Sequence, residues 1–219
     1  MEELADGVHL LDGRPRYVIN VYLVGDVLID AGTDRAAKRI LSELRGRTVS
    51  AHALTHAHLD HFGSSHEVCE ALGVPLWCGE ADAEAVETGK ILRARSALEP
   101  LLERAPPPAP HPVARRLVEG DEVGGFEVIA TPGHSAGHVS YWRESDRTLV
   151  LGDVLFGMKL VPPRKGLREP PTPFTPDPSR NRDAARRVAA FDPALVCFGH
   201  GPPLRDTRRF KDFAAGLPA

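Results

Sequence analysis

The feature that most constrains this chain is a six-residue segment with four metal-ligating side chains, His56-Ala57-His58-Leu59-Asp60-His61. It follows residues 48–55, an apolar run typical of a β-strand. Alternate side chains of an extended segment share a side, so we expect His56, His58 and Asp60 to converge on one point. His61 then points elsewhere, which suits a second ion beside the first. Zinc, iron and manganese accept imidazole and carboxylate ligands. Surface histidines are the disfavoured interpretation, because chance gives this pattern in on the order of one chain in a thousand.

Three further metal-ligating residues follow other strand-like runs. They are His134, Asp153 and His200, each directly preceded by a glycine, after the runs 126–130, 148–151 and 195–198. Polar residues at strand ends are typical of functional sites in α/β folds. A single histidine of this kind would more often be structural. Three such residues, added to the six-residue segment, favour a shared site.

The order of these motifs, T-H-x-H-x-D-H, T-P-G-H, G-D and G-H-G, resembles the metallo-β-lactamase-fold hydrolases over nearly the whole chain. Residues 20–24 and 28–32 are also similar to the first hairpin of that family. The resemblance implies a four-layered αββα sandwich of the α/β class. The most similar branch is the glyoxalase II-like (hydroxyacylglutathione hydrolase-like) thioesterases, because Asp153 matches a bridging carboxylate that true β-lactamases lack.

The resemblance also implies a ligand set. It assigns His56, His58 and His134 to one ion, Asp60, His61 and His200 to the other, and Asp153 to a bridge between them. We therefore expect two divalent metal ions, zinc first, with iron or manganese as alternatives. Two such ions share a water and lower its pKa, and the resulting hydroxide attacks an acyl carbon. Asp60 and Asp153 are counted as catalytic for this reason, and a thioester or lactone is the expected substrate.

Three other residues are candidates for orienting the ligands. Asp30, Thr55 and His138 are placed where they can hydrogen-bond the ligand imidazoles. For Asp30 and Thr55, local hydrogen bonding to the backbone is at least as good an interpretation.

Two alternative functions stay open. A mononuclear iron persulfide dioxygenase has a similar fold and uses a subset of these ligands, and a non-catalytic metal-binding module is the second alternative. Glyoxalase II itself has a C-terminal helical region that helps to bind glutathione. Only residues 202–219 follow the last ligand here, so we expect a different thioester or a lactone.

Two segments interrupt the strand pattern. Residues 79–112 combine helical patterning with a proline run and are interpreted as an insertion, either solvent-exposed or a lid over the substrate. Residues 157–178 are interpreted as a basic, proline-rich loop. Its four cations are expected to bind an anionic part of the substrate, with a solvated loop as the alternative: Lys159, Arg164, Lys165 and Arg168.

The composition is consistent with a single domain over residues 1–219 that acts on a small molecule. A formal net charge of -3 disfavours nucleic acid as a partner, and no apolar run approaches the length of a membrane span. The acidic N-terminus lacks a secretory pattern, so we expect a cytoplasmic protein. Cys69, Cys78 and Cys197 are expected to be reduced thiols, with Cys197 in a buried strand. The oligomeric state is left open.

Apolar periodicity predicts four helices. They cover residues 34–45, 61–72, 179–191 and 207–215, with Ser179 as the N-cap of the third.

Overall fold

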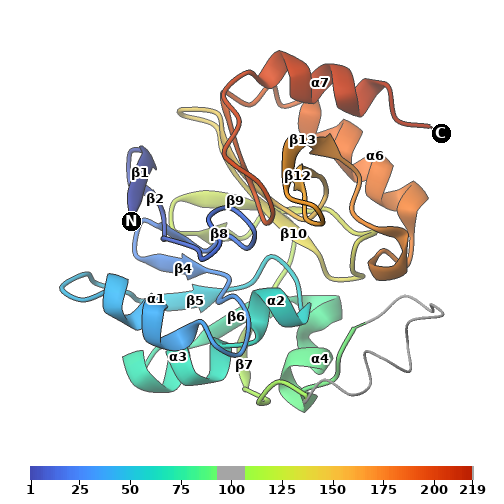
Figure 1. Cartoon of the computed structure of the whole chain (residues 1–219). Helices are drawn as coiled ribbons and strands as arrows, with labels where there is room; N and C mark the ends of the chain where they lie inside the picture. Colours follow the sequence, from blue (N-terminus) through green and yellow to red (C-terminus); the bar gives the residue numbers. More distant parts are fainter. Residues whose placement is uncertain (93–106, 219) are drawn as a thin grey trace.

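Two β-sheets packed face to face, with helices on both outer faces, make up the architecture (Figure 1). The computed structural model describes residues 1–92 and 107–218. In the first sheet the strands lie in sequence order: β1 (Glu2–Ala5), β2 (Val8–Leu10), β3 (Tyr22–Val24), β4 (Val27–Ile29), β5 (Ala51–Ala53), β6 (Leu76–Gly79) and β7 (Val113–Leu117). Strands β1 to β4 pair antiparallel, and β4 to β7 pair parallel.

The second sheet is built from the C-terminal half of the chain. Its spatial order is β14 (Leu195–Phe198), β11 (Thr148–Gly152), β10 (Val139–Arg143), β9 (Phe126–Ala130) and β8 (Glu122–Val123). The β14–β11 pair is parallel and the other pairs are antiparallel. The three apolar runs predicted in this half as strands, 126–130, 148–151 and 195–198, are confirmed, and Cys197 is buried in β14.

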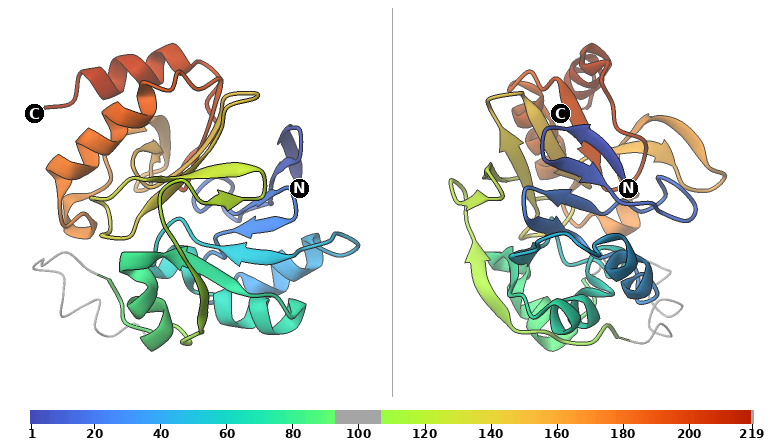
Figure 2. Two further views of the ribbon diagram at one scale, coloured as in Figure 1. Left: turned by 180° about the vertical axis from the view of Figure 1, so that it is seen from behind. Right: turned by 90° about the vertical axis from the view of Figure 1, so that its left-hand side faces the viewer.

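Apolar side chains from both sheets fill the space between them, including Tyr22, Ile29, Phe126, Tyr141 and Val150. The outer face of the first sheet packs on α1 (Ala37–Glu43) and α3 (Ser65–Leu72). The outer face of the second sheet packs on α6 (Pro178–Ala189) and α7 (Thr207–Ala215). Figure 2 shows the same layering from behind and from the side. The αββα sandwich is confirmed, as is the helix predicted for residues 207–215.

The prediction of one continuous helix over residues 61–72 is wrong. The segment forms α2 (Leu59–Phe62) and then α3, with Gly63 and Ser64 between them. The Ser64 hydroxyl donates to the Thr33 carbonyl and accepts from the backbone N–H groups of Ala36 and Ala37. These contacts attach the residues between α2 and α3 to the loop before α1. Tertiary hydrogen bonds therefore override helical periodicity here.

Helix α6 begins earlier than predicted, and its N-cap is Asp177, not Ser179. The Asp177 side chain accepts a hydrogen bond from the Arg180 backbone N–H at 2.9 Å. Pro178 occupies the first helical position, where a missing N–H costs nothing, so the cap falls on the residue before the proline.

The interpretation of residues 157–178 as a loop is also wrong. The segment starts in a hairpin, β12 (Phe156–Lys159) and β13 (Arg164–Arg168), followed by the short 3₁₀ helix η2 (Thr172–Phe174). In the 79–112 insertion, η1 (Glu80–Asp82) and α4 (Ala83–Thr88) follow β6, whereas residues 93–106 lie outside the described part. The three cysteines are free thiols, as predicted, and all three are buried. Within residues 1–92 and 107–218, no helix has the length and apolar character needed to cross a membrane.

Candidate metal centre

The predicted ligands lie together because they follow strands that end at the same edge of the two sheets. Asp30 directly follows β4, and residues 54–61 follow the parallel neighbour β5. On the other sheet, Asp153 directly follows β11, and His200 lies two residues beyond its parallel neighbour β14. Asp30 has a φ of 62°, a conformation that non-glycine residues adopt at some energetic cost.

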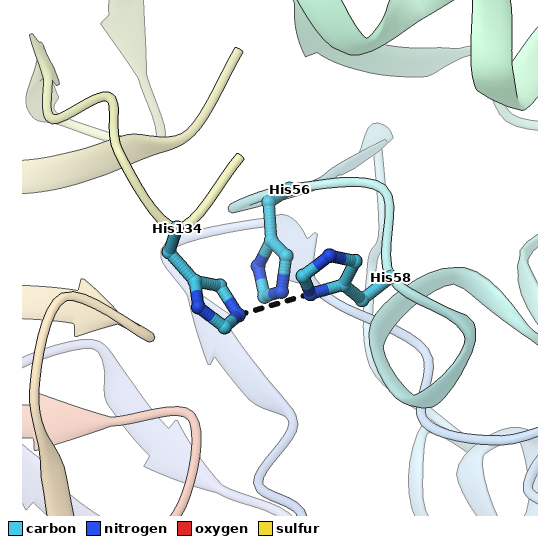
Figure 3. A group of neighbouring side chains, drawn as sticks. All are labelled: His56, His58 and His134. Carbon is cyan, nitrogen blue, oxygen red and sulfur yellow. Dashed lines mark hydrogen bonds between the residues drawn. The ribbon is translucent and has the colours of Figure 1, made fainter. Parts of the chain in front are cut away.

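Seven side chains form three overlapping groups whose candidate ligand atoms lie within 4.8 Å of one another. The groups are His56–His58–His134, His56–His61–Asp153, and Asp60–His61–His200. Figure 3 shows the first group, in which His58 Nδ1 lies 2.9 Å from His134 Nε2. The expectation that Asp60 converges with His56 and His58 is wrong. Helix α2 begins at Leu59, so alternation stops there, and Asp60 lies with His61 and His200.

Asp153 lies at the centre of the whole cluster. Its Oδ2 atom is 3.8 Å from His56 Nε2, 3.4 Å from His61 Nε2, 3.3 Å from His134 Nε2 and 3.2 Å from His200 Nε2. The same oxygen therefore faces histidines of all three groups. A Cβ atom on the neighbouring Gly199 would lie 2.0 Å from Asp153 Oδ1, so only glycine leaves this space open.

Four of the ligand imidazoles are held through Nδ1. The Thr55 hydroxyl donates to Asp30 and so accepts from His56 Nδ1 at 3.0 Å, and His61 Nδ1 donates to Asp30 at 2.8 Å. On the other side, His134 Nδ1 donates to the Thr175 hydroxyl, and His200 Nδ1 donates to the Val18 carbonyl. Each contact occupies Nδ1 and leaves Nε2 as the nitrogen that faces a cation, which is the usual arrangement around ligating histidines. The predicted orienting role of Asp30 and Thr55 agrees with these contacts.

Several atoms of the cluster are buried without a hydrogen-bond partner in the described part of the chain: His56 Nε2, His58 Nε2 and Asp153 Oδ1. Leaving buried polar atoms unpaired costs about 1–3 kcal/mol each, so such groups call for a partner outside the protein. Two imidazole nitrogens and a carboxylate oxygen form a donor set that suits a borderline divalent cation. The residues present therefore fit bound metal.

Electrostatics differ between the two sides of the cluster. Burial and the neighbouring His134 lower the pKa of His58 from 6.5 to about 3, which keeps it neutral and ready to ligate. At His200, burial acts in the same direction, but Asp153 and Asp60 outweigh it and raise the pKa to about 10. Carboxylates likewise hold the pKa of His61 well above its usual value against burial. The side that contains Asp60 is therefore negative enough to attract a cation.

Comparison with known proteins agrees with this geometry. The family model described as the metallo-beta-lactamase superfamily matches residues 14–200. The chain belongs to the metallo-β-lactamase superfamily. A curated relative, the probable metallo-hydrolase YflN of Bacillus subtilis (strain 168), is 30% identical over 237 residues, which cover 92% of this chain and 86% of the relative.

Two other similarities bear on the chemistry of the superfamily. The solved structure of TTHA1623 in a di-iron-bound form is 31% identical, has a TM-score of 0.68, and covers 89% of this chain and 92% of that one. The hydroxyacylglutathione hydrolase of Bdellovibrio bacteriovorus (strain ATCC 15356 / DSM 50701 / NCIMB 9529 / HD100) is 28% identical over 146 residues, or 60% of this chain and 48% of the relative. These similarities support a general assignment to the metallo-hydrolases. Assignment to the glyoxalase II-like branch stays a prediction.

His138 contacts a candidate ligand, but not one of the imidazoles that it was predicted to orient. It hydrogen-bonds no ligand imidazole in the described structure. Its Nε2 atom accepts the backbone N–H of Asp153 at 3.0 Å, and its Nδ1 atom donates to the Thr131 hydroxyl at 2.8 Å. These two contacts define one neutral tautomer, and burial lowers the pKa of His138 well below its usual value. His138 therefore orients Asp153 through the backbone.

Asp82 is a residue of the site that the sequence did not reveal. Its fully buried carboxylate accepts from Ala57 N at 3.0 Å, Gly137 N at 2.7 Å and Ser135 Oγ at 2.6 Å. It thus joins the loop of His56 and His58 to the loop of His134. One feature could have pointed to Asp82. It lies just after a strand, at the same sheet edge as the other site residues. Thr175 and the Val18 carbonyl were also missed, because their partners are distant in sequence.

A cavity of about 650 Å³, formed by described residues, opens onto the cluster. His58, Asp60, His134, Asp153 and His200 line it, and the Asp60 side chain is 38% exposed. The remaining wall is mainly apolar, with Leu59, Ile91, Leu92, Phe156, Leu160 and Phe174. The four basic residues predicted to bind substrate are on the β12–β13 hairpin, and none of them lines this cavity.

Proposed function

We propose that this protein is a dinuclear metal-dependent hydrolase that cleaves a thioester or a lactone with an apolar acyl part. The observation that supports it most is the position of Asp153 Oδ2, within 3.8 Å of four imidazole nitrogens from both sides of the cluster. Two divalent ions held there by the seven candidate ligands would supply Lewis acidity and would lower the pKa of water towards neutrality. Zinc is the proposed metal, and iron is supported by the di-iron form of TTHA1623.

The chain's own residues would prepare this chemistry in three ways. Asp30, Thr55 and Thr175 hold the Nδ1 side of ligand imidazoles, which fixes the direction of each Nε2 atom. The apolar wall of the cavity binds the acyl part and excludes water around it. A thiolate leaves without needing a proton. Cleavage of a thioester therefore requires no general acid in addition to the candidate ligands.

The substrate class is supported from two directions. The apolar cavity suits an acyl chain, and the partial similarity to a hydroxyacylglutathione hydrolase suits thioester chemistry. The proposed substrate is a small molecule. A cytoplasmic location also stays a proposal, supported by the three buried, free cysteines.

Metal content tests the dinuclear proposal directly. We expect protein purified without added metal or chelator to hold close to two equivalents, measured by elemental analysis, because seven candidate ligands exceed what one ion takes. Removing the metal should abolish hydrolysis of a panel of acyl thioesters and lactones. Adding back zinc, iron or manganese one at a time then identifies the metal that restores activity. One firm equivalent with oxygen-dependent persulfide turnover would instead identify a dioxygenase. Bound metal without turnover of any substrate would identify a non-catalytic module.

We retain a separate proposal for the β12–β13 hairpin, in which its cations bind an anionic end of a substrate that extends out of the cavity. The double variant Lys159→Ala/Arg164→Ala should then raise KM for anionic substrates much more than it lowers kcat, since this contact is equal in ground and transition states. Added salt should mimic the change, because exposed charges are screened within about 8–10 Å. An unchanged ratio of anionic to neutral turnover would show that the hairpin is only solvated.

A further inference from the structure

A second cluster of ligating side chains lies outside the centre described above. It consists of His66 and Glu70 on α3 and of His111, which precedes β7, and it shares no residue with the main centre. The three candidate ligand atoms lie within 4.8 Å of one another. His66 and Glu70 are four residues apart, so they share one face of α3.

The distance between the two imidazoles suits a shared ion. His66 Nδ1 and His111 Nδ1 are 3.2 Å apart. Two nitrogens bound to a tetrahedral zinc at about 2.0–2.1 Å are separated by about 3.3–3.4 Å. The alternative, one hydrogen bond between two neutral rings, explains this distance but assigns no role to the adjacent Glu70.

The chemical state of the cluster is also suitable. Burial, and then the neighbouring His66, lower the pKa of His111, which favours the neutral imidazole that a metal requires. His111 is buried and its backbone N–H donates to the Val86 carbonyl, so its position is set by α4. Glu70 is exposed and free to adjust to an incoming cation.

The cluster lies at the wall of the substrate cavity. His66 and Glu67 line that cavity from α3, and Pro107, Pro108 and Ala109 line it from the segment that leads to His111. An ion held by all three side chains would therefore cross-link α3 to residues 107–111, two separate parts of one wall.

We propose that His66, Glu70 and His111 form an additional metal site that takes one borderline divalent cation such as Zn²⁺ and ties α3 to residues 107–111. With three protein ligands, one of them exposed, the site binds zinc more weakly than the main centre and fills when free zinc is raised. The proposal does not depend on the reaction at the main centre.

Equilibrium dialysis of the purified holoprotein against increasing free Zn²⁺, followed by elemental analysis, tests this site. The wild type should bind one equivalent more than the double variant His66→Ala/Glu70→Ala. Glu70→Ala alone should raise the zinc concentration for half-occupancy about tenfold or more, since loss of even an indirect partner of a metal ligand costs about 10–100-fold in affinity. The readout is a difference between variants, so it holds whatever the main centre contains.

Glu67→Ala is the matched control, because Glu67 is an exposed glutamate on the same helix that is not part of the cluster. It should bind zinc like the wild type. The proposal is overturned if wild type and double variant bind equal amounts, or if Glu67→Ala loses the extra equivalent as readily as Glu70→Ala. Because Glu70 is exposed, its replacement leaves the fold intact, and a loss of zinc in Glu70→Ala reports on the site itself.

Discussion

Replacing Asp153 with alanine is expected to remove activity and reduce metal content together. The carboxylate faces His56, His61, His134 and His200 through one oxygen, so its loss affects both sides of the cluster at once. Removing a negative charge from the centre of a group of histidines also weakens the attraction for cations. We expect kcat/KM on the best thioester or lactone to fall by well over 100-fold, with a loss of bound metal in elemental analysis.

His138→Ala is the comparison for this variant. His138 touches Asp153 only through the backbone N–H, so we expect a smaller loss of about 10–100-fold, typical of residues that position a ligand. Thermal unfolding of both proteins separates a stability loss from a catalytic one. Comparable kinetics and metal content for the two variants would show that Asp153 does not bridge the ions.

Asp82→Ala is expected to have the largest effect on stability. The change leaves two buried backbone N–H groups, of Ala57 and Gly137, without an acceptor. Each unsatisfied group costs about 1–3 kcal/mol, so the free energy of unfolding should fall by about 2–6 kcal/mol. Because Asp82 joins the two ligand loops, metal affinity should fall as well. Chemical denaturation measures the first effect and metal titration the second.

Asp121→Ala provides a matched control for Asp82. Asp121 also accepts a backbone N–H, that of Val118 at 2.9 Å, and contacts the Arg115 side chain, but it is partly exposed. Water replaces these partners when the carboxylate is removed, so the cost should stay near or below about 1 kcal/mol and metal affinity should not change. Equal destabilisation by the two variants would show that the buried contacts of Asp82 between the two ligand loops stabilise the fold no more than those of the partly exposed Asp121.

Much of the fold and the ligand set is readable from local patterns. The runs at 126–130, 148–151 and 195–198 form strands, as their apolar and β-branched residues predict. His134, Asp153 and His200 then reach one edge because neighbouring strands end together. The chemistry of the seven side chains, imidazole and carboxylate, is likewise a property of the sequence.

Other features depend on contacts between residues far apart in the chain. Asp60 joins His200 because α2 starts at Leu59, and the break before α3 depends on Ser64 binding the loop before α1. His138 orients a backbone group, which side-chain types do not predict.

The sequence by itself therefore determined the main strands and the side chains that a metal requires, since periodicity and residue chemistry act locally, and its motif order carried the family resemblance that implies the sandwich. Only the tertiary structure decided which of the two expected groupings Asp60 joins and what orients these side chains. It also brought His111 to His66 and Asp82 to Gly137. The physical reason is that these are hydrogen bonds and close approaches across loops, whose geometry follows from the packing of the two sheets and leaves no periodic trace in the sequence.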